Sequence, residues 1–150
     1  MRFRFVWIGK TKDKNWRALQ DEYLRRLSHF ARCEIAEIKE SQSFETKETE
    51  GERILNQLAA NALVVLLDVR GKEIGSHELA RSVEDWQNRG LREIAFVIGG
   101  QDGVSANVEK RADLRLSLSK MTLTHEAARV LLAEQLYRAF TIILNYPYQK

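Results

Sequence analysis

The sequence has few of the residues that form covalent or metal-bound cross-links. Its 150 residues include one cysteine, Cys33, and one proline, and the three histidines are widely separated. One cysteine cannot form a disulfide within the chain, and neither Cys33 nor the histidines have the spacing of metal ligands. We therefore expect a fold held together by its apolar core, with no bound metal, in a reducing cytoplasm.

Long apolar runs are also missing. The chain has no uninterrupted apolar stretch of about eighteen residues, the length typical of a membrane-spanning helix. The apolar part of MRFRFVWIGK is too short for a signal peptide. These absences predict no membrane partner, and the length predicts a single domain over residues 1–150.

Three common site patterns do not occur. The chain lacks the dinucleotide-binding G-x-G-x-x-G, the P-loop G-x-x-x-x-G-K-[ST] and the hydrolase elbow G-x-S-x-G. Charge gives a weaker signal. The net charge is +3, and residues 1–32 carry nine Lys or Arg against three acidic residues. A basic N-terminal third suits a phosphate backbone, but it is equally typical of a solvated helix face, so charge alone leaves both open.

Strands and helices are predicted to alternate along the chain. Apolar runs predict strands over residues 3–8, 33–38, 63–67, 94–98 and 114–119. Helical periodicity predicts helices over 15–28, around 54–58, 76–90, 105–111 and about 126–145, with residues 39–51 as a polar loop. This order indicates an α/β domain with a mostly parallel sheet flanked by helices.

Local signals predict the ends and faces of these elements. Helix caps are expected at Ser76, Ser105 and Thr124, and Pro147 is expected to stop the last helix. The first helix should bury its apolar residues, which are Trp16, Leu19, Tyr23 and Leu27. The last strand should place three leucines on one face: Leu114, Leu116 and Leu118.

The last helix is apolar almost all round. Its one polar stripe consists of Glu134, Arg138, Thr141 and Asn145. A helix with so much apolar surface must be covered on several sides. Periodicity leaves two covers open, the core of a monomer and a second copy of the chain.

Three segments are expected to form a ligand site. In parallel sheets, ligands bind at the carboxyl ends of the strands, near a switch in strand order. Residues 67–71, 98–103 and 118–123 each follow a predicted strand, and the second contains a Gly-Gly turn that leaves backbone bare. His125 adjoins the third segment at the start of the last helix.

Four stretches of sequence carry a resemblance to a known family. LLDVRGKEI, FVIGGQDGVS, LSLSKMTLTH and RVLLAEQLYRAFTIILNYPYQK resemble the bacterial ribosomal RNA large subunit methyltransferase H family, small members of the SPOUT class. The resemblance implies an α/β fold with a C-terminal trefoil knot, a homodimer and S-adenosylmethionine as cofactor. It also implies methylation of N3 of a pseudouridine in the helix 69 loop of 23S rRNA, on the assembled ribosome.

By position, the resemblance places the cofactor contacts on the three segments already identified. They fall on Leu67, Gly99, Leu118, Ser119, Lys120, Met121, Thr122 and Leu123. A valine at Gly99 is expected to prevent binding while leaving the fold intact. A homodimer agrees with the apolar last helix, and we expect Leu136 and Phe140 in or beside the dimer contact.

Three residues are candidates for catalysis. Loss of the N3 proton leaves an anionic ring, which a positioned cation or hydrogen-bond donor would stabilise. Arg138 is the first candidate, with Glu134 one turn earlier to orient it, although the two could be an ordinary surface pair. His125 and Tyr148 are second candidates, Tyr148 by stacking on or hydrogen-bonding to a flipped base.

The chain departs from the family pattern in two places. The usual tail histidine is Gln149, so that histidine cannot be an obligatory base here. The usual proline before His125 is Thr124, which can still cap the helix. Two rival functions remain, an RNA-binding relative without activity, and a hydrolase or small-molecule enzyme using Asp68, His125 and Glu134.

Overall fold

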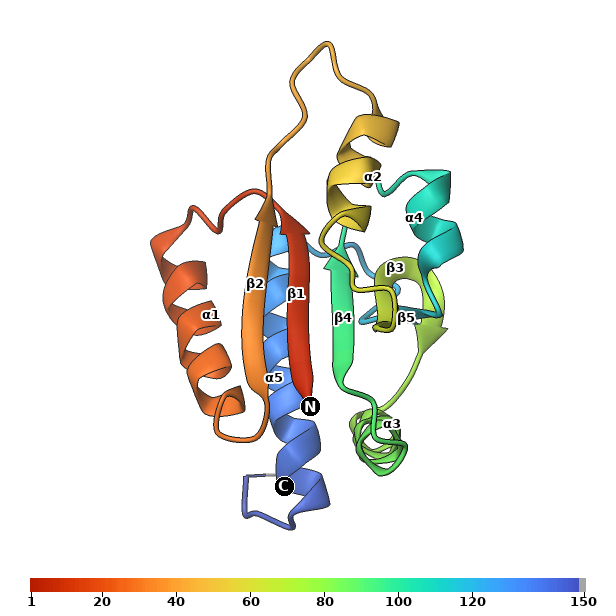
Figure 1. The fold of residues 1–150 in the computed structure, drawn as a ribbon. Helices are drawn as coiled ribbons and strands as arrows, with labels where there is room; N and C mark the ends of the chain where they lie inside the picture. The colour runs from red at the N-terminus through yellow and green to blue at the C-terminus, as the bar shows by residue number, and fades with distance from the viewer. Residues whose placement is uncertain (149–150) are drawn as a thin grey trace.

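The structure is a computed structural model, and the description covers residues 1–148 (Figure 1). Within these residues five helices surround one five-stranded sheet. In chain order the elements are β1 (Arg2–Ile8), α1 (Lys14–Leu27), β2 (Arg32–Ile38), α2 (Lys47–Leu55), β3 (Leu63–Glu73), α3 (Ser76–Asn88), β4 (Glu93–Ile98), α4 (Ala106–Arg111), β5 (Leu114–Ser117) and α5 (His125–Ile143).

The sheet is parallel throughout, with the strand order β2-β1-β4-β3-β5. Parallel pairing brings the carboxyl ends of the strands to one edge, and the arrowheads of β1, β2 and β4 mark this edge at the top of Figure 1. The predicted α/β class and the predicted sheet are therefore confirmed. The trefoil knot stays a prediction.

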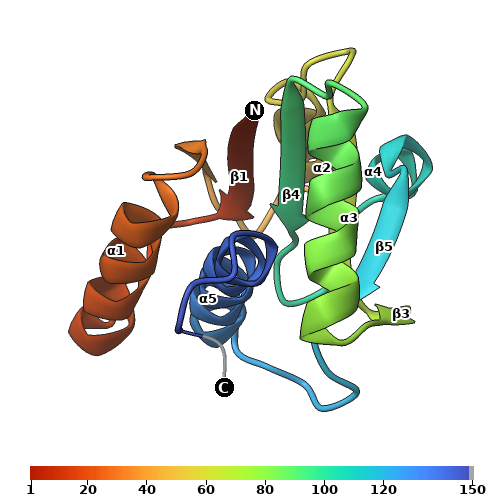
Figure 2. The ribbon, with the colours of Figure 1, turned by 90° about the horizontal axis from the view of Figure 1, so that it is seen from below.

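Helices cover the two faces of the sheet unequally. α1, α5 and α3 lie side by side on one face, as the end-on view in Figure 2 shows, and α2 and α4 lie on the other. Alternate residues of β1 enter the two cores, Phe3, Phe5 and Trp7 on the three-helix side and Val6 on the other. Buried strands with both faces covered explain the continuous apolar runs in the sequence.

Several predicted boundaries and faces are wrong. α1 buries Gln20 and Leu24, whereas Leu19 is 43% exposed. Gln20 is buried because it hydrogen-bonds to Thr11 at 2.5 Å, a contact outside the helix. In β5 Leu114 is exposed and Ser117 is buried, and the strand ends before Leu118.

The ends of three helices also differ from prediction. α2 begins at Lys47, inside the predicted loop, and ends before Leu58. Ser76 is not a cap: Gly75 is the N-cap of α3, and the Ser76 hydroxyl instead bonds Gln135 of α5. α5 ends before Pro147, because Asn145 takes a left-handed conformation with φ of 55°. The Ser105 and Thr124 caps are confirmed.

α5 is covered by its own chain. It lies against the sheet between α1 and α3 (Figure 2). Leu136 and Phe140 are 0% and 2% exposed within this single chain. They therefore belong to the subunit core and present almost no surface to a second copy, and their place beside a dimer contact stays a prediction. The periodicity correctly predicted burial on several sides, but it did not identify the covering elements.

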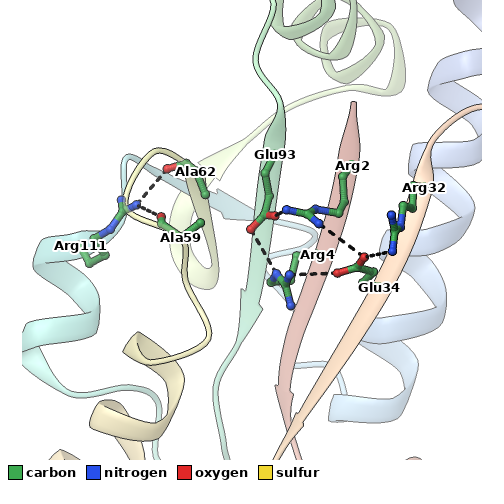
Figure 3. Close-up of polar contacts among 8 residues, drawn as sticks. All are labelled: Arg2, Arg4, Arg32, Glu34, Ala59, Ala62, Glu93 and Arg111. Carbon is green, nitrogen blue, oxygen red and sulfur yellow. Dashed lines mark hydrogen bonds and ion pairs between the residues drawn. The ribbon is translucent and has the colours of Figure 1, made fainter.

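Charged side chains close the opposite edge of the sheet, where the strands begin (Figure 3). Glu93 on β4 is 3% exposed and pairs with Arg2 and Arg4 of β1. Glu34 on β2 pairs with the same two arginines and with Arg32. These pairs join the first turns of three strands, so they fix the relative register of β2, β1 and β4.

We expect Glu93→Ala to destabilise the fold by about 2–3 kcal/mol. Breaking a fully buried pair costs about 3–5 kcal/mol, and the cost should be lower here because both arginines keep some contact with water. The measurement is the free energy of unfolding in urea. Glu34→Ala is the matched control and should cost roughly 1 kcal/mol or less, since its carboxylate is 25% exposed. Equal losses of unfolding free energy in the two variants would contradict the argument that the burial of Glu93 makes its ion pairs the more important ones.

Candidate functional site

The three predicted segments meet at the carboxyl edge of the sheet. They enclose a cavity of about 530 Å³, here called the loop cavity. Leu67, Gly99, Leu118, Ser119, Met121, Thr122 and Leu123 all line it, as predicted for a ligand site. Lys120 does not: its side chain is 87% exposed and lies 3.6 Å from a Glu73 oxygen. The volume is in the range typical of small-molecule sites.

A bulge in β3 forms the first wall. The strand continues beyond its predicted end, and its pairing with β5 shifts between Leu67 and Lys72. The extra residues leave the ladder, which brings Asp68, Val69 and Arg70 to the loop cavity. Arg70 donates hydrogen bonds to Asp68 and, at 3.2 Å, to Glu109. The Arg70 guanidinium holds the pKa of Asp68 below its usual value, so the rim carries an ionised carboxylate at neutral pH.

A tight turn after β4 forms the second wall. Gly103 has φ of +78°, and its N–H donates to the Gly100 carbonyl at 3.0 Å. A Cβ atom at Gly99 would lie 2.6 Å from Cγ1 of Val104 and 3.2 Å from the Gly103 carbonyl. A side chain at Gly99 would therefore collide with the turn itself, which differs from the expectation that it would occupy open ligand space.

The third wall is the loop between β5 and α5. Ser117 donates to the Ser119 carbonyl at 2.9 Å, and Ser119 accepts from the Met121 N–H at 3.0 Å. Thr124 then caps α5 by accepting from the Ala127 N–H at 3.2 Å. These short-range bonds hold the loop open, so that backbone and apolar side chains face the loop cavity.

The first turns of α5 are fastened to the chain after β1. Glu126 accepts hydrogen bonds from the N–H groups of Lys12 and Asp13 at 3.2 and 3.3 Å. Arg129 is 3% exposed and donates to the Ile8 carbonyl and to Thr11. These contacts set the position of His125, which lines the loop cavity.

The other two catalytic candidates lie at the far end of α5. Arg138 donates to Glu134 at 3.0 Å, Tyr148 donates to the same carboxylate at 3.0 Å, and the guanidinium lies 4.8 Å from the centre of the Tyr148 ring. Thirteen residues separate Arg138 from His125, which is about 20 Å along a helix. One chain therefore does not bring Arg138 or Tyr148 to the loop cavity.

Arg138 and Tyr148, which both bind Glu134, keep their protons at neutral pH. The Glu134 carboxylate raises the pKa of Arg138. Burial, followed by hydrogen bonds with Tyr23 and Glu134, raises the pKa of Tyr148, so its hydroxyl stays protonated at neutral pH. Gln149, the residue that replaces the usual tail histidine, lies outside the described residues.

The hydrolase alternative does not fit this geometry. Asp68 and His125 both line the loop cavity, but Glu134 is bound to Arg138, Tyr148 and Gln135 two turns and more along α5. The three side chains cannot act as one triad. Among residues 1–148 no three His, Cys, Asp or Glu side chains are placed to hold a metal ion.

Sequence reasoning missed residues that reach this edge from other elements. Lys47, at the start of α2, lines the loop cavity, and Arg129 lies buried behind His125. Lys47 was hidden in a polar stretch without helical periodicity. Arg129 was not singled out, because its partners lie more than one hundred residues earlier in the chain.

Comparison with known proteins identifies the family. Residues 1–149 match the family described as "Predicted SPOUT methyltransferase". The chain is 44% identical over 153 residues to the ribosomal RNA large subunit methyltransferase H of Desulfotalea psychrophila, with 100% of both chains covered. It belongs to the SPOUT methyltransferase family. The protein of the same name from Geotalea daltonii is 42% identical over 151 residues, with 99% of both chains covered. The sequence resemblance and the methyltransferase assignment are thus confirmed.

Solved structures share the fold at low identity. A methyltransferase of Bordetella pertussis Tohama I aligns with a TM-score of 0.58 at 15% identity, covering 92% of this chain and 93% of its own. A methylase family protein of Haemophilus influenzae Rd KW20 aligns with a TM-score of 0.57 at 16% identity, covering 99% and 70%. Among residues 1–148 no helix has the length and apolarity to cross a membrane.

We expect Gly99→Val to remove S-adenosylmethionine binding by displacing the turn that ends at Val104. Calorimetric titration measures the affinity, and circular dichroism with urea unfolding checks the fold. Gly75→Val is the matched control, because no atom lies within 4 Å of a Cβ there and binding should be unchanged. A Gly99→Val variant that binds as tightly as the parent would show that the turn does not shape the cofactor site.

Proposed function

We propose that this SPOUT methyltransferase transfers a methyl group from S-adenosylmethionine to N3 of a pseudouridine in the helix 69 loop of 23S rRNA. The observation that carries the proposal is the full-length match, at 44% identity, to a protein named ribosomal RNA large subunit methyltransferase H. The loop cavity at the carboxyl edge of the sheet supports it. The assembled ribosome is the proposed substrate, and the cytoplasm is the proposed location.

The loop cavity suits this cofactor. Leu67, Leu116, Leu118 and Leu123 supply apolar surface for an adenine ring. Bare backbone at the Gly99–Gly100 turn and in the loop after β5 offers N–H and carbonyl groups for polar edges. The ionised Asp68 complements the cofactor's positive charge. When bound, S-adenosylmethionine supplies a methyl group already activated by its sulfonium, so the chain has to bind, orient and manage the acceptor proton.

The cofactor proposal is tested by transfer of labelled methyl to ribosomes that lack this modification. We expect labelling that requires S-adenosylmethionine and falls when uridine replaces the target pseudouridine. Calorimetric titration with S-adenosylmethionine distinguishes the two functions. An active enzyme binds the cofactor, whereas the rival, an RNA-binding relative without activity, does not. Equal labelling of uridine would contradict the pseudouridine specificity.

We further propose a homodimer formed by the outward face of α5. Leu131 is 42% exposed, and Ile142 and Arg138 lie further along the same side of the helix. Leu131 is midway between His125 and Arg138. Two copies packed antiparallel about Leu131 would therefore bring Arg138 of one copy beside His125 of the other, within reach of its loop cavity. Arg138 and Tyr148 would then serve the partner's site.

We expect Leu131→Glu to give monomers of 17.4 kDa in sedimentation equilibrium, where the parent chain is a dimer. A glutamate at the centre of a two-fold contact would lie against the same glutamate of the other copy. The two buried like charges would repel each other and lose their hydration. Leu114→Glu is the matched control, since Leu114 on β5 is 45% exposed and should leave the dimer intact. A parent chain that sediments as a stable monomer would contradict the homodimer.

We expect Arg138→Ala to keep cofactor affinity within a few-fold and to lose methyl transfer by about 100-fold or more, the scale of a lost transition-state donor. Mixing this variant with Gly99→Val should restore activity. Each mixed dimer would join an intact loop cavity in one copy to an intact Arg138 in the other. The control is each variant alone, which should stay inactive. A mixture without activity would place Arg138 outside the partner's site.

A further inference from the structure

A second cavity, here called the side cavity, adjoins the loop cavity at the same edge. Its volume is about 500 Å³, and its walls are Ile8 at the end of β1, residues between Glu40 and Lys47, and Glu50 of α2. It shares Lys47, Gly100–Gly103 and His125 with the loop cavity. Groups bound in the two cavities would face each other across the Gly-Gly turn.

The side cavity lies at the switch in strand order. β1 and β4 are neighbours, but the helices that follow them cover opposite faces: α1 lies beside α5, and α4 lies beside α2 (Figure 1). In open α/β sheets such a point is where ligands bind. Ile8 ends β1 and Gly100 follows β4, and both are in the wall of the side cavity. The fold therefore provides two ligand positions at this edge.

The charges in the side cavity select the kind of ligand. Four carboxylates, Glu40, Glu45, Glu50 and Asp102, line it together with one lysine, Lys47. Carboxylates repel phosphate and accept hydrogen bonds from N–H groups. A neutral nucleobase with N–H groups therefore suits this cavity, and an RNA phosphate does not.

Glu50 is the carboxylate available to such a base. Glu45 is bound by Arg53, Glu40 lies 3.5 Å from Lys12, and Asp102 is exposed to solvent on the turn after β4, whereas Glu50 is half-buried. Within residues 1–148 Glu50 has no Lys or Arg at ion-pair distance, and it accepts one hydrogen bond, from Ser41 at 2.8 Å. That bond occupies Oε2 and leaves Oε1 for a ligand.

The free oxygen of Glu50 faces the wall between the cavities. A Cβ atom at Gly100 would lie 3.3 Å from Oε1 of Glu50. The glycine thus leaves this oxygen uncovered on the side where the loop cavity begins. A proton acceptor in that place is next to any atom that receives a methyl group from the loop cavity.

An exposed aromatic side chain lies in the same stretch of chain. Phe44 is 83% exposed; it does not itself line the side cavity, but Gln42 and Glu45, close to it in the chain, do. Exposed aromatic rings beside a pocket are typical of proteins that bind unpaired bases, because every base has a face on which a ring can stack. Phe44 therefore supports a base as the occupant.

We propose that the side cavity binds the acceptor pseudouridine and that Glu50 takes its N3 proton. This inference rests on the proposed function. The N3–H bond breaks as its proton passes to the Glu50 carboxylate, and the N3 electron pair forms the bond to the methyl carbon. The carbon–sulfur bond of the sulfonium donor breaks, and its electron pair leaves sulfur as a neutral thioether. Ser41 is a positioning residue that orients the carboxylate.

The first test is the rate of methyl transfer to unmodified ribosomes as a function of pH. Glu50→Gln should lower the rate at neutral pH by about 100-fold or more, the usual range for a lost general base, with cofactor affinity unchanged. Its deficit should shrink as the pH rises, because the N3–H then ionises without help. Glu52→Gln, an exposed carboxylate of α2 that lines neither cavity, is the control and should stay within about three-fold of the parent.

The second test separates binding of the acceptor from the chemical step. Phe44→Ala should weaken the affinity for ribosomes by about five-fold or more, with a smaller effect on the rate at saturation. Glu50→Asp keeps a carboxylate and should retain more activity than Glu50→Gln, and urea unfolding checks that each variant folds. These effects together would support the side cavity as the acceptor site.

Three outcomes would overturn the inference. Full activity of Glu50→Gln would remove Glu50 from the reaction, and a deficit that is the same at every pH would reduce its role to structure. Unchanged ribosome affinity in Phe44→Ala would show that the acceptor base does not bind beside Phe44. A parent chain that methylates no ribosomes would overturn the proposed function itself, which distinguishes that failure from a fully active Glu50→Gln variant.

Discussion

A cluster of aromatic rings holds the centre of this molecule together. The ring of Phe96 in β4 stacks on that of Phe5 in β1, with 5.8 Å between the ring centres, and lies edge-on to the ring of Phe3, with 5.5 Å between the centres. Trp86 of α3 and Phe140 of α5 complete the cluster. Each such pair adds about 0.5–1.5 kcal/mol beyond burial of its area. The cluster fixes β1 against β4 and the helices against both strands. The alignment of the strand ends, and with it both cavities, depends on this packing.

That dependence explains which parts of the site were predictable. Leu67 and Gly99 each follow an apolar run, and parallel strands bring such ends together whatever the loops between them contain. The meeting of three distant segments therefore followed from strand type alone. Lys120 could not be placed in this way, because within a loop the direction of each side chain is set by local bonds such as that of Ser119 to the Met121 N–H.

The parts that were not predictable depend on contacts between distant residues. Gln20 replaces Leu19 on the buried face of α1 because Thr11 satisfies its polar group. The start of α2 is polar, and its burial rests chiefly on Gly51 and Ile54, too few residues to produce a helical pattern. For α5 the 3.6-residue period correctly required cover on several sides, but a period cannot distinguish α1 and α3 from a second copy. The period therefore did not show that Leu136 and Phe140 are buried within the single chain.

Arg129 shows how such a distant contact shapes function. Its guanidinium is buried between the Ile8 carbonyl, Thr11 and the Trp7 ring, 4.9 Å from the ring centre, and burial lowers its pKa. Within residues 1–148 no carboxylate lies at ion-pair distance from Arg129, and burying such a cation costs free energy, which the hydrogen bonds and the aromatic ring only partly offset. In return, the start of α5 is held at a fixed distance from the end of β1. Ile8 lines the side cavity and His125 lines both cavities, so Arg129, together with Glu126, holds in place the wall across which donor and acceptor would meet.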